Sequence, residues 1–270
     1  MKSAEVSGLP ETFRGGGIEV DFDRSICLPP DMAGVAMGYE TASVLNTMRT
    51  AESNPTLPVQ ALELGTGSGV CLAALLHGVW HKQGLTVTGF DIDEAAVNIT
   101  RHNLAKATQK TGQSIDSDIF AADWRNDDTW QRLRLHSYDV VMCNPPYLAE
   151  GAPLMDGYES VPRAAVYSEG DGLAHHRFLL PRLLGLLSVR TGATLITRFP
   201  STIHGQNELS QSIDDVIGEA VTQTPSLSGF AIVRRILAPV AVGRNMASVT
   251  ISRSDGPLPP HMRLQLAAHS

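Results

Sequence analysis

The densest chemical signal in the sequence is the turn Asn144-Pro145-Pro146-Tyr147, which follows the apolar run 138–143. Neither proline has an N–H group, so the turn is stiff and presents carbonyl oxygens as acceptors. The side-chain oxygen of Asn144 and the carbonyl oxygen of Pro145 can together accept both hydrogens of a planar NH2 group, on which Tyr147 can pack. The turn therefore predicts a site for an amide or exocyclic-amine nitrogen, with a rigid loop as the alternative.

A glycine-rich turn, ELGTGSGV at residues 63–70, lies between an apolar strand and an apolar helix. Glycines at 65, 67 and 69 allow a sharp turn and a close approach of the backbone to a ligand. The following helix presents unpaired N–H groups and the positive end of its dipole, which suit an anionic group. The spacing departs from GxGxxG, so a dinucleotide site is the weaker interpretation.

Acidic residues stand at the ends of the next two expected strands. Asp91 ends the strand after the glycine-rich turn, where a carboxylate can accept hydrogen bonds from both ribose hydroxyls of an adenosine ligand. Asp123 and Trp124 follow the next strand and offer an acceptor for an adenine amine and an aromatic face. The series of strand ends therefore predicts a site for an adenosine-containing cofactor.

These residues are positioned by an alternation of strands and helices, which is typical of an α/β protein with a mostly parallel sheet and helices on both faces. The expected strands are 18–22, 59–64, 86–91, 117–122, 138–143 and 193–199, with a terminal antiparallel pair at 230–237 and 246–253. The expected helices are 38–48, 70–80, 94–110, 173–188 and 206–220. Irregular chain is expected at 1–17, 28–36 and 148–172.

Composition narrows the class of protein. The 270 residues are 43% hydrophobic and carry a net charge of −7, which favours a folded core and disfavours general nucleic-acid binding. Three dispersed cysteines exclude a disulfide framework and indicate a reducing compartment. We find no metal-ligand spacing, no signal-peptide pattern and no apolar run of the roughly 20 residues that a membrane span needs. We therefore expect a cytoplasmic protein without a metal site or a membrane partner.

Together, ELGTGSGV, FDIDEAAVNITRHNL (90–104), Asp123 and CNPPYL (143–148) resemble the class I S-adenosylmethionine-dependent methyltransferases. Within that class the chain is most similar to the HemK/PrmC family, which methylates a glutamine side-chain amide in peptide chain release factors. The stretch GYESVPRAAVYSEGDGLAHHRFLLPRLL (157–184) and the segment Gly38-Tyr39-Glu40-Thr41 also resemble that family. The resemblance covers roughly residues 13–250.

The resemblance implies a Rossmann-like class I methyltransferase fold with a seven-stranded sheet and S-adenosyl-L-methionine as cofactor. The implied catalytic residues are Asn144, Pro145, Pro146 and Tyr147. The implied cofactor contacts are Glu63, Gly65, Thr66, Gly67, Gly69, Asp91, Ile92, Asp123, Trp124 and Asn144. The implied substrate contacts are Tyr39, Glu40, Glu159 and Arg163.

The expected organisation is an N-terminal extension at 1–58 that flanks the active site, a catalytic domain at 59–254 and a C-terminal tail at 255–270. The expected activity is N-methylation of a protein glutamine or a small amide or amine. The alternatives are methylation of an exocyclic amine in RNA or DNA, and cofactor binding without methyl transfer.

Two departures from the family's pattern bear on the substrate. The fifth expected core strand ends in Thr197-Arg198-Phe199, where the family generally has a glutamate and a glycine. Met37-Gly38-Tyr39 replaces the arginine-proline expected before Glu40. We also expect this chain to lack the family's N-terminal helical domain, which helps to recognise the release factor, because only about 58 residues precede the first expected core strand. The methyl-transfer site is therefore expected to be retained, with a different acceptor.

Overall fold

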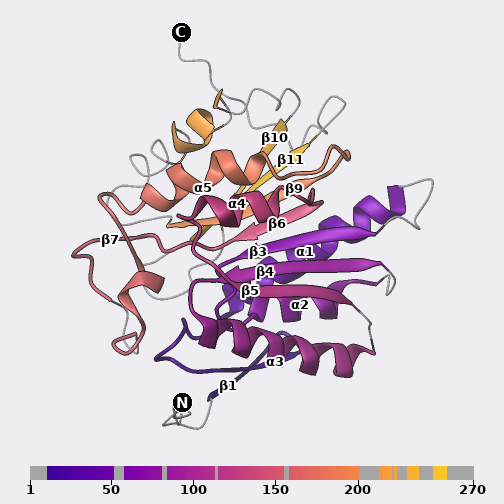
Figure 1. Ribbon diagram of the computed structural model, residues 1–270, viewed down its shortest axis with the longest axis horizontal. Helices are drawn as coiled ribbons and strands as arrows, with labels where there is room; N and C mark the ends of the chain where they lie inside the picture. The colour runs from indigo at the N-terminus through magenta and orange to yellow at the C-terminus, as the bar shows by residue number, and fades with distance from the viewer. Residues whose placement is uncertain are drawn as a thin grey trace.

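The computed structural model describes residues 11–51, 58–80, 84–112, 115–154, 158–200, 213, 215–220, 222–223, 230–236 and 246–253. Its centre is a seven-stranded sheet in the order β10-β11-β9-β6-β3-β4-β5, which Figure 1 shows from top to bottom. The strands are β3 (Val59–Leu64), β4 (Leu85–Asp91), β5 (Asp116–Ala121), β6 (Val140–Cys143), β9 (Thr194–Pro200), β10 (Phe230–Ile236) and β11 (Met246–Arg253).

Five strands of this sheet are parallel, and the last two are not. β5, β4, β3, β6 and β9 pair in parallel, whereas β11 pairs antiparallel to β9 and β10 antiparallel to β11. The expected mostly parallel seven-stranded sheet with a terminal antiparallel pair is therefore confirmed. Because parallel neighbours end at one edge, β3, β4, β5, β6 and β9 bring their following loops together there.

Helices cover both faces of the sheet. They are α1 (Met32–Ala51), α2 (Val70–Gly78), α3 (Glu94–Thr111), α4 (Asp127–Leu133) and α5 (Ala174–Leu184). Side chains of α1, α2 and α3 share one buried cluster with β3, β4 and β6, and those of α4 and α5 share another on the opposite face. The apolar strands are buried on both faces as a result, which explains why they read as continuous apolar runs.

An N-terminal hairpin corrects the expectation of irregular chain over residues 1–17. β1 (Glu11–Gly15) pairs antiparallel with β2 (Ile18–Phe22), and residues 1–10 lie outside the described part. Gly16 and Gly17 form the two-residue turn with φ of 58° and 82°, which suits a tight hairpin. The Gly16-Gly17 pair was the signal in the sequence for this hairpin.

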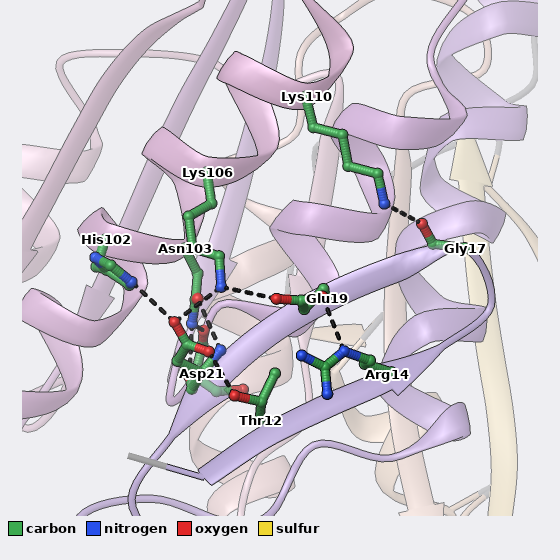
Figure 2. Close-up of polar contacts among 10 residues, drawn as sticks. Thr12, Arg14, Gly17, Glu19, Asp21, His102, Asn103, Lys106 and Lys110 are labelled. Atoms are coloured by element: carbon green, nitrogen blue, oxygen red, sulfur yellow. Dashed lines mark hydrogen bonds and ion pairs between the residues drawn. The ribbon is translucent and has the colours of Figure 1, made fainter. Parts of the chain in front are cut away.

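The hairpin is fixed to α3 by polar contacts (Figure 2). Asp21 accepts a hydrogen bond from Lys106 Nζ at 2.8 Å, and His102 Nε2 lies 2.9 Å from the same carboxylate. Asn103 accepts from the Asp21 backbone N–H at 2.9 Å and donates to the Asp21 carbonyl at 2.7 Å. The N-terminal segment is therefore anchored to the layer that carries the glycine-rich turn.

Helix α1 begins earlier than expected, at Met32 within the supposed loop 28–36. Asp31 caps it, because its carboxylate accepts a hydrogen bond from the Gly34 N–H at 2.8 Å. Gly38 allows α1 to approach α2 closely, since a β-carbon there would lie 2.2 Å from the Cys71 carbonyl oxygen. Gly38, the first residue of the expected helix, therefore permits helix packing within α1.

Three other differences concern short elements. α4 follows β5 where no helix was expected, and Asn126 caps it by accepting from the Asp128 N–H. Within the supposedly irregular 148–172, β7 (Leu148–Ala149) pairs with β8 (Tyr167–Ser168), beside the 3-10 turn η1 (Arg163–Ala165). Of the helix expected at 206–220, residues 213 and 215–220 are helical and the rest lies outside the described residues, as does the tail 255–270.

Candidate functional site

The glycine-rich turn leaves β3 at the edge where the parallel strands end. Gly65, Gly67 and Gly69 have φ of 68°, 51° and 72°, in the left-handed region that favours glycine. The N–H groups of Gly65 and Thr66 donate to the Phe90 carbonyl at 2.9 and 3.2 Å, which ties the turn to the end of β4. The turn is therefore held in place by its own backbone contacts.

Asp91 joins the end of β4 to this turn. Its Oδ2 accepts from the Gly67 N–H at 2.8 Å and its Oδ1 accepts from the Asp93 N–H at 3.1 Å. Burial raises the pKa of the Asp91 carboxyl, while these backbone hydrogen bonds lower it. Each carboxylate oxygen keeps a lone pair for a further donor, such as a ligand hydroxyl. Ile92, the next residue, is 66% exposed, as expected of a side chain that could cover a flat ligand.

Trp124 closes the other side of the turn. A β-carbon on Gly65 would lie 3.8 Å from the Trp124 ring, so the ring stands beside the turn. Asp123, also partly buried, accepts from the Arg125 N–H at 2.8 Å. The edge of the Trp124 ring meets His175 with the ring centroids 5.4 Å apart.

The Asn144-Pro145-Pro146-Tyr147 turn adjoins the same edge. The buried Oδ1 of Asn144 has no hydrogen-bond partner, and both prolines are buried. His175 Nδ1–H donates to the Pro146 carbonyl at 3.3 Å, which links this turn to Trp124.

Gly172 fixes the same turn from the opposite side. It has φ of 87°, and a β-carbon on it would lie 2.4 Å from the Tyr147 carbonyl oxygen. Only glycine fits this approach without displacing the backbone. The chain from Gly172 into α5 therefore supports the proline turn.

Glu63 is the buried acid of the site. Burial raises its pKa to about 8, while a hydrogen bond with the Cys71 thiol lowers it and the charge of Asp91 raises it. Its Oε2 has no hydrogen-bond partner. A buried carboxyl with an unused oxygen can accept from a ligand donor or face a ligand cation.

Two of the expected cofactor residues serve the packing of α3. The Thr66 hydroxyl accepts from Thr100 Oγ1 at 3.1 Å. A β-carbon on Gly69 would lie 3.0 Å from the Thr100 side chain. Asn103, one turn further along α3, donates to the Ser68 carbonyl at 2.8 Å and was missed in the sequence, where a buried asparagine inside a helix was its signal.

Of the four expected substrate residues, two are neighbours on α1 and two lie in the segment between β7 and β8. Tyr39 donates to the Gly16 carbonyl at 2.6 Å and packs on Gly78, at the end of α2 remote from the glycine-rich turn. Glu40 accepts from Thr250 Oγ1 at 2.8 Å. The exposed Glu159 and Arg163 belong to the segment between β7 and β8, where the Arg163 guanidinium lies 4.4 Å from the Tyr167 ring centroid.

The described residues contain neither a metal-binding cluster nor a helix that could span a membrane. No group of three His, Cys, Asp or Glu side chains there could hold a metal ion. None of the described helices is both long and apolar enough to cross a membrane.

Known proteins match this chain in sequence and in fold. Residues 39–159 match the family model of the methyltransferase small domain. A release factor glutamine methyltransferase of Caulobacter vibrioides is 32% identical over 131 residues, which are 47% of this chain and 40% of that protein. A tRNA1(Val) (adenine(37)-N6)-methyltransferase of Mannheimia succiniciproducens is 32% identical over 95 residues, which are 35% of this chain and 36% of that protein. The chain thus spans well under two thirds of these relatives.

The fold also matches a solved structure, that of SMU.776 complexed with SAH, with a TM-score of 0.53 at 12% identity over 93% of this chain and 58% of that one. The sheet and the helix layers define a protein with the class I methyltransferase fold, and residues 39–159 are similar to the methyltransferase small domain. Within that class, the chain is similar to the release factor glutamine methyltransferases, as its sequence motifs predicted.

Proposed function

We propose that this chain is an S-adenosylmethionine-dependent N-methyltransferase that acts on a planar amide or amine nitrogen. The observation that carries the proposal is the buried, unpartnered Oδ1 of Asn144, next to two prolines that offer only carbonyl oxygens. A buried acceptor without a donor destabilises the folded protein by roughly 1–3 kcal/mol. The presence of such an acceptor at Asn144 therefore favours a donor supplied by the substrate.

The residues at the ends of β3, β4 and β5 fit the cofactor. The free lone pairs of Asp91 suit ribose hydroxyls, and the exposed Ile92 with the Trp124 ring suits the two sides of an adenine. Glu63 suits the amino group of the methionine part because its buried oxygen has no other partner. When bound, the cofactor supplies a methyl group activated by the positive sulfonium.

The proline turn orients the acceptor. Asn144 and the Pro145 carbonyl accept the two N–H hydrogens, which keeps the nitrogen lone pair directed at the methyl group. A new N–C bond forms as the S–C bond breaks, and the acceptor nitrogen then loses a proton to water. Positioning of this kind can supply about 7–11 kcal/mol of the barrier reduction.

Protein glutamine or a small amide or amine is the proposed acceptor class. The similarity to release factor glutamine methyltransferases supports an amide. The net charge of −7 disfavours a phosphate backbone as the main partner. The three cysteines, all free and buried, support a reducing, cytoplasmic location.

A nucleic-acid amine is the second candidate. The similarity to a tRNA adenine N6-methyltransferase favours it, because an adenine amine is also a planar NH2 group. Such a substrate would have to bring the base out of its stack into the proline turn.

We further propose that residues 1–58 flank the active site of a domain at 59–254. The position of Cys27 supports this role, because a β-carbon added to Gly67 would lie 3.7 Å from the β-carbon of Cys27. The segment after the hairpin therefore runs beside the glycine-rich turn.

The test is transfer of labelled methyl groups into cell extract, followed by separation into protein, nucleic acid and small molecules. We expect label in protein or small molecules, and a loss of about 100-fold or more in Asn144→Ala. Asn98→Ala, an exposed asparagine on α3, is the matched control and should transfer normally. Label in nucleic acid would favour the second candidate. Bound cofactor without any labelled product, or full activity in Asn144→Ala, would contradict the assignment.

A further inference from the structure

Arg198 lies beside the proline turn. β9 pairs with β6 so that Thr197 lies opposite Cys143. The next residues, Arg198 and Asn144, therefore belong to adjacent segments of the chain. Side chains alternate along a strand, so Arg198 shares a face with Ile196, the face covered by α1 and α2. Its Nη2 donates to the Ala33 carbonyl at 3.3 Å. The guanidinium therefore lies between the end of β9 and the first turn of α1.

The backbone of Arg198 is fixed as well. His176 Nε2–H donates to the Arg198 carbonyl at 2.7 Å, and the His176 ring stacks on Phe199 with the centroids 4.0 Å apart. Burial lowers the pKa of His176 to about 4, so the ring is neutral at pH 7 and keeps this hydrogen bond. The position of the guanidinium is thus set by β9 and α5.

The Arg198 guanidinium is buried and has N–H donors that make no hydrogen bond. Arg198 is 1% exposed, and its Nε and Nη1 have no hydrogen-bond partner. The nearest carboxylate oxygen, Glu40 Oε2, is 3.7 Å from Nη1, beyond hydrogen-bonding distance, and the other Glu40 oxygen is engaged by Thr250. Each unsatisfied donor of a buried charge is costly. The existing contacts therefore balance part of the charge and use Nη2, but they leave Nε and Nη1 without hydrogen bonds.

Neighbouring charges keep the group ionised. Burial lowers the pKa of Arg198, and the nearby Glu40, Cys71, Asp31 and Tyr147 raise it. A guanidinium remains protonated at any physiological pH. Tyr147, the last of these neighbours, belongs to the proline turn.

Unused polar atoms occur at the ends of three adjacent strands: Glu63 Oε2 on β3, Asn144 Oδ1 after β6, and Arg198 Nε and Nη1 on β9. The first two are acceptors, and the third is a cationic donor. An acceptor molecule that satisfies the last two needs an N–H group for Asn144 and an anionic oxygen for Arg198. A carboxylate matches the guanidinium in charge and in planar geometry.

We propose that Arg198 binds a carboxylate of the methyl acceptor, so that the substrate is an amide or amine with a carboxylate close to its NH2 group. This inference rests on the proposed function, because it requires Asn144 to hold the acceptor nitrogen. Arg198 is then the residue that selects anionic acceptors over neutral ones.

The test uses protein saturated with S-adenosylhomocysteine and two probes, N-acetyl-L-glutamine and its neutral N-methylamide. Titration calorimetry on the wild-type protein should show at least about tenfold tighter binding of the carboxylate probe. Arg198→Gln should bind both probes equally, with the affinity for the neutral probe unchanged, and Arg198→Lys should keep part of the preference. Arg14→Gln, which removes the same charge from the exposed hairpin, should behave as the wild type.

Equal binding of the two probes by the wild-type protein, binding of neither, or a preference retained in Arg198→Gln would overturn the inference. Thermal unfolding of each variant separates loss of fold from loss of selection. Failure of S-adenosylhomocysteine to bind the wild-type protein would instead overturn the proposed function, so the two failures are distinguishable.

Discussion

The two halves of the strand edge differ in how their polar groups are satisfied. At the ends of β3 and β4, the Asp91 carboxylate holds the Gly67 and Asp93 N–H groups, and the turn donates to the Phe90 carbonyl. At the ends of β6 and β9, buried polar atoms of Asn144 and Arg198 have no hydrogen-bond partner. Apart from Glu63 Oε2, which also has no hydrogen-bond partner, the first half is organised by contacts within the chain, whereas we propose that the second is completed by what binds there.

This difference matches the chemistry proposed for each half. A cofactor is the same in every reaction, so a site formed in advance avoids the cost of ordering it on binding. An acceptor must be selected, and a buried unsatisfied group rejects molecules that cannot satisfy it. Selectivity should therefore depend on the β6–β9 half and cofactor affinity on the β3–β4 half.

The largest stability effect is expected from Asn103→Ala, which removes hydrogen bonds that support the β3–β4 half of the strand edge. The substitution leaves the Ser68 carbonyl and both Asp21 backbone groups without their partner. With about 1–3 kcal/mol for a buried group left unsatisfied, we expect the free energy of unfolding to fall by roughly 3 kcal/mol in denaturant titrations. Affinity for S-adenosylhomocysteine should fall as well.

Asn98→Ala on the exposed face of the same helix is the control, with an expected change within about 0.5 kcal/mol. If the Asn103→Ala protein were as stable as this control, the hydrogen bonds of Asn103 to Asp21 and Ser68 would contribute nothing to the free energy of unfolding.

A smaller effect is expected from Gly172→Ala, which disturbs the other half. The added β-carbon meets the Tyr147 carbonyl, and the left-handed backbone adds strain of about 1–3 kcal/mol. Methyl transfer should fall about tenfold while binding of S-adenosylhomocysteine stays constant. Gly170→Ala has a positive φ of 64° but nothing within 4 Å, so it isolates the strain from the contact. If the two variants transferred methyl groups equally well, the close approach of Gly172 would not support the proline turn.

The smallest change in the free energy of unfolding is expected from Glu63→Gln, when stability is measured near pH 5. The folded protein holds the Glu63 proton up to about pH 8, whereas the unfolded chain releases it near its ordinary value of 4.5. Since the native state binds the extra proton in this range, stability falls as pH rises from about 4.5 to about 8. The variant should flatten this fall in thermal unfolding curves recorded between pH 5 and 8.5. Glu94→Gln, an exposed residue, should leave the slope unchanged, and an unchanged slope in Glu63→Gln would contradict the assignment.

The sequence predicted the parallel core well because strands such as β3 and β4 are mostly apolar and end at a glycine or an acid. The terminal antiparallel pair was also predicted, whereas the position of β11 between β9 and β10 was not. The hairpin and the early start of α1 were missed, because Gly16 and Gly34 suggest loops when they are considered singly. Their roles depend on partners far along the chain.

Within the site, local motifs were easier to predict than long-range contacts. The turns at 63–70 and 143–148 are contiguous, so their chemistry is legible in the sequence. Asn103, His175 and Arg198 act through residues from other elements, and nothing in their immediate neighbours indicates those contacts. For Tyr39, resemblance gave a substrate role, but its hydroxyl group contacts Gly16 at the remote end of α2.

Titration of S-adenosylhomocysteine into the wild-type, Asp91→Ala and Asn144→Ala proteins tests the division of the edge most directly. Loss of hydrogen bonds to a carboxylate should weaken binding at least about tenfold in Asp91→Ala. Asn144→Ala, in contrast, should bind within twofold of the wild type while it loses methyl transfer. Equal loss of binding in both variants, or wild-type affinity in Asp91→Ala, would contradict the separation of a cofactor half from an acceptor half.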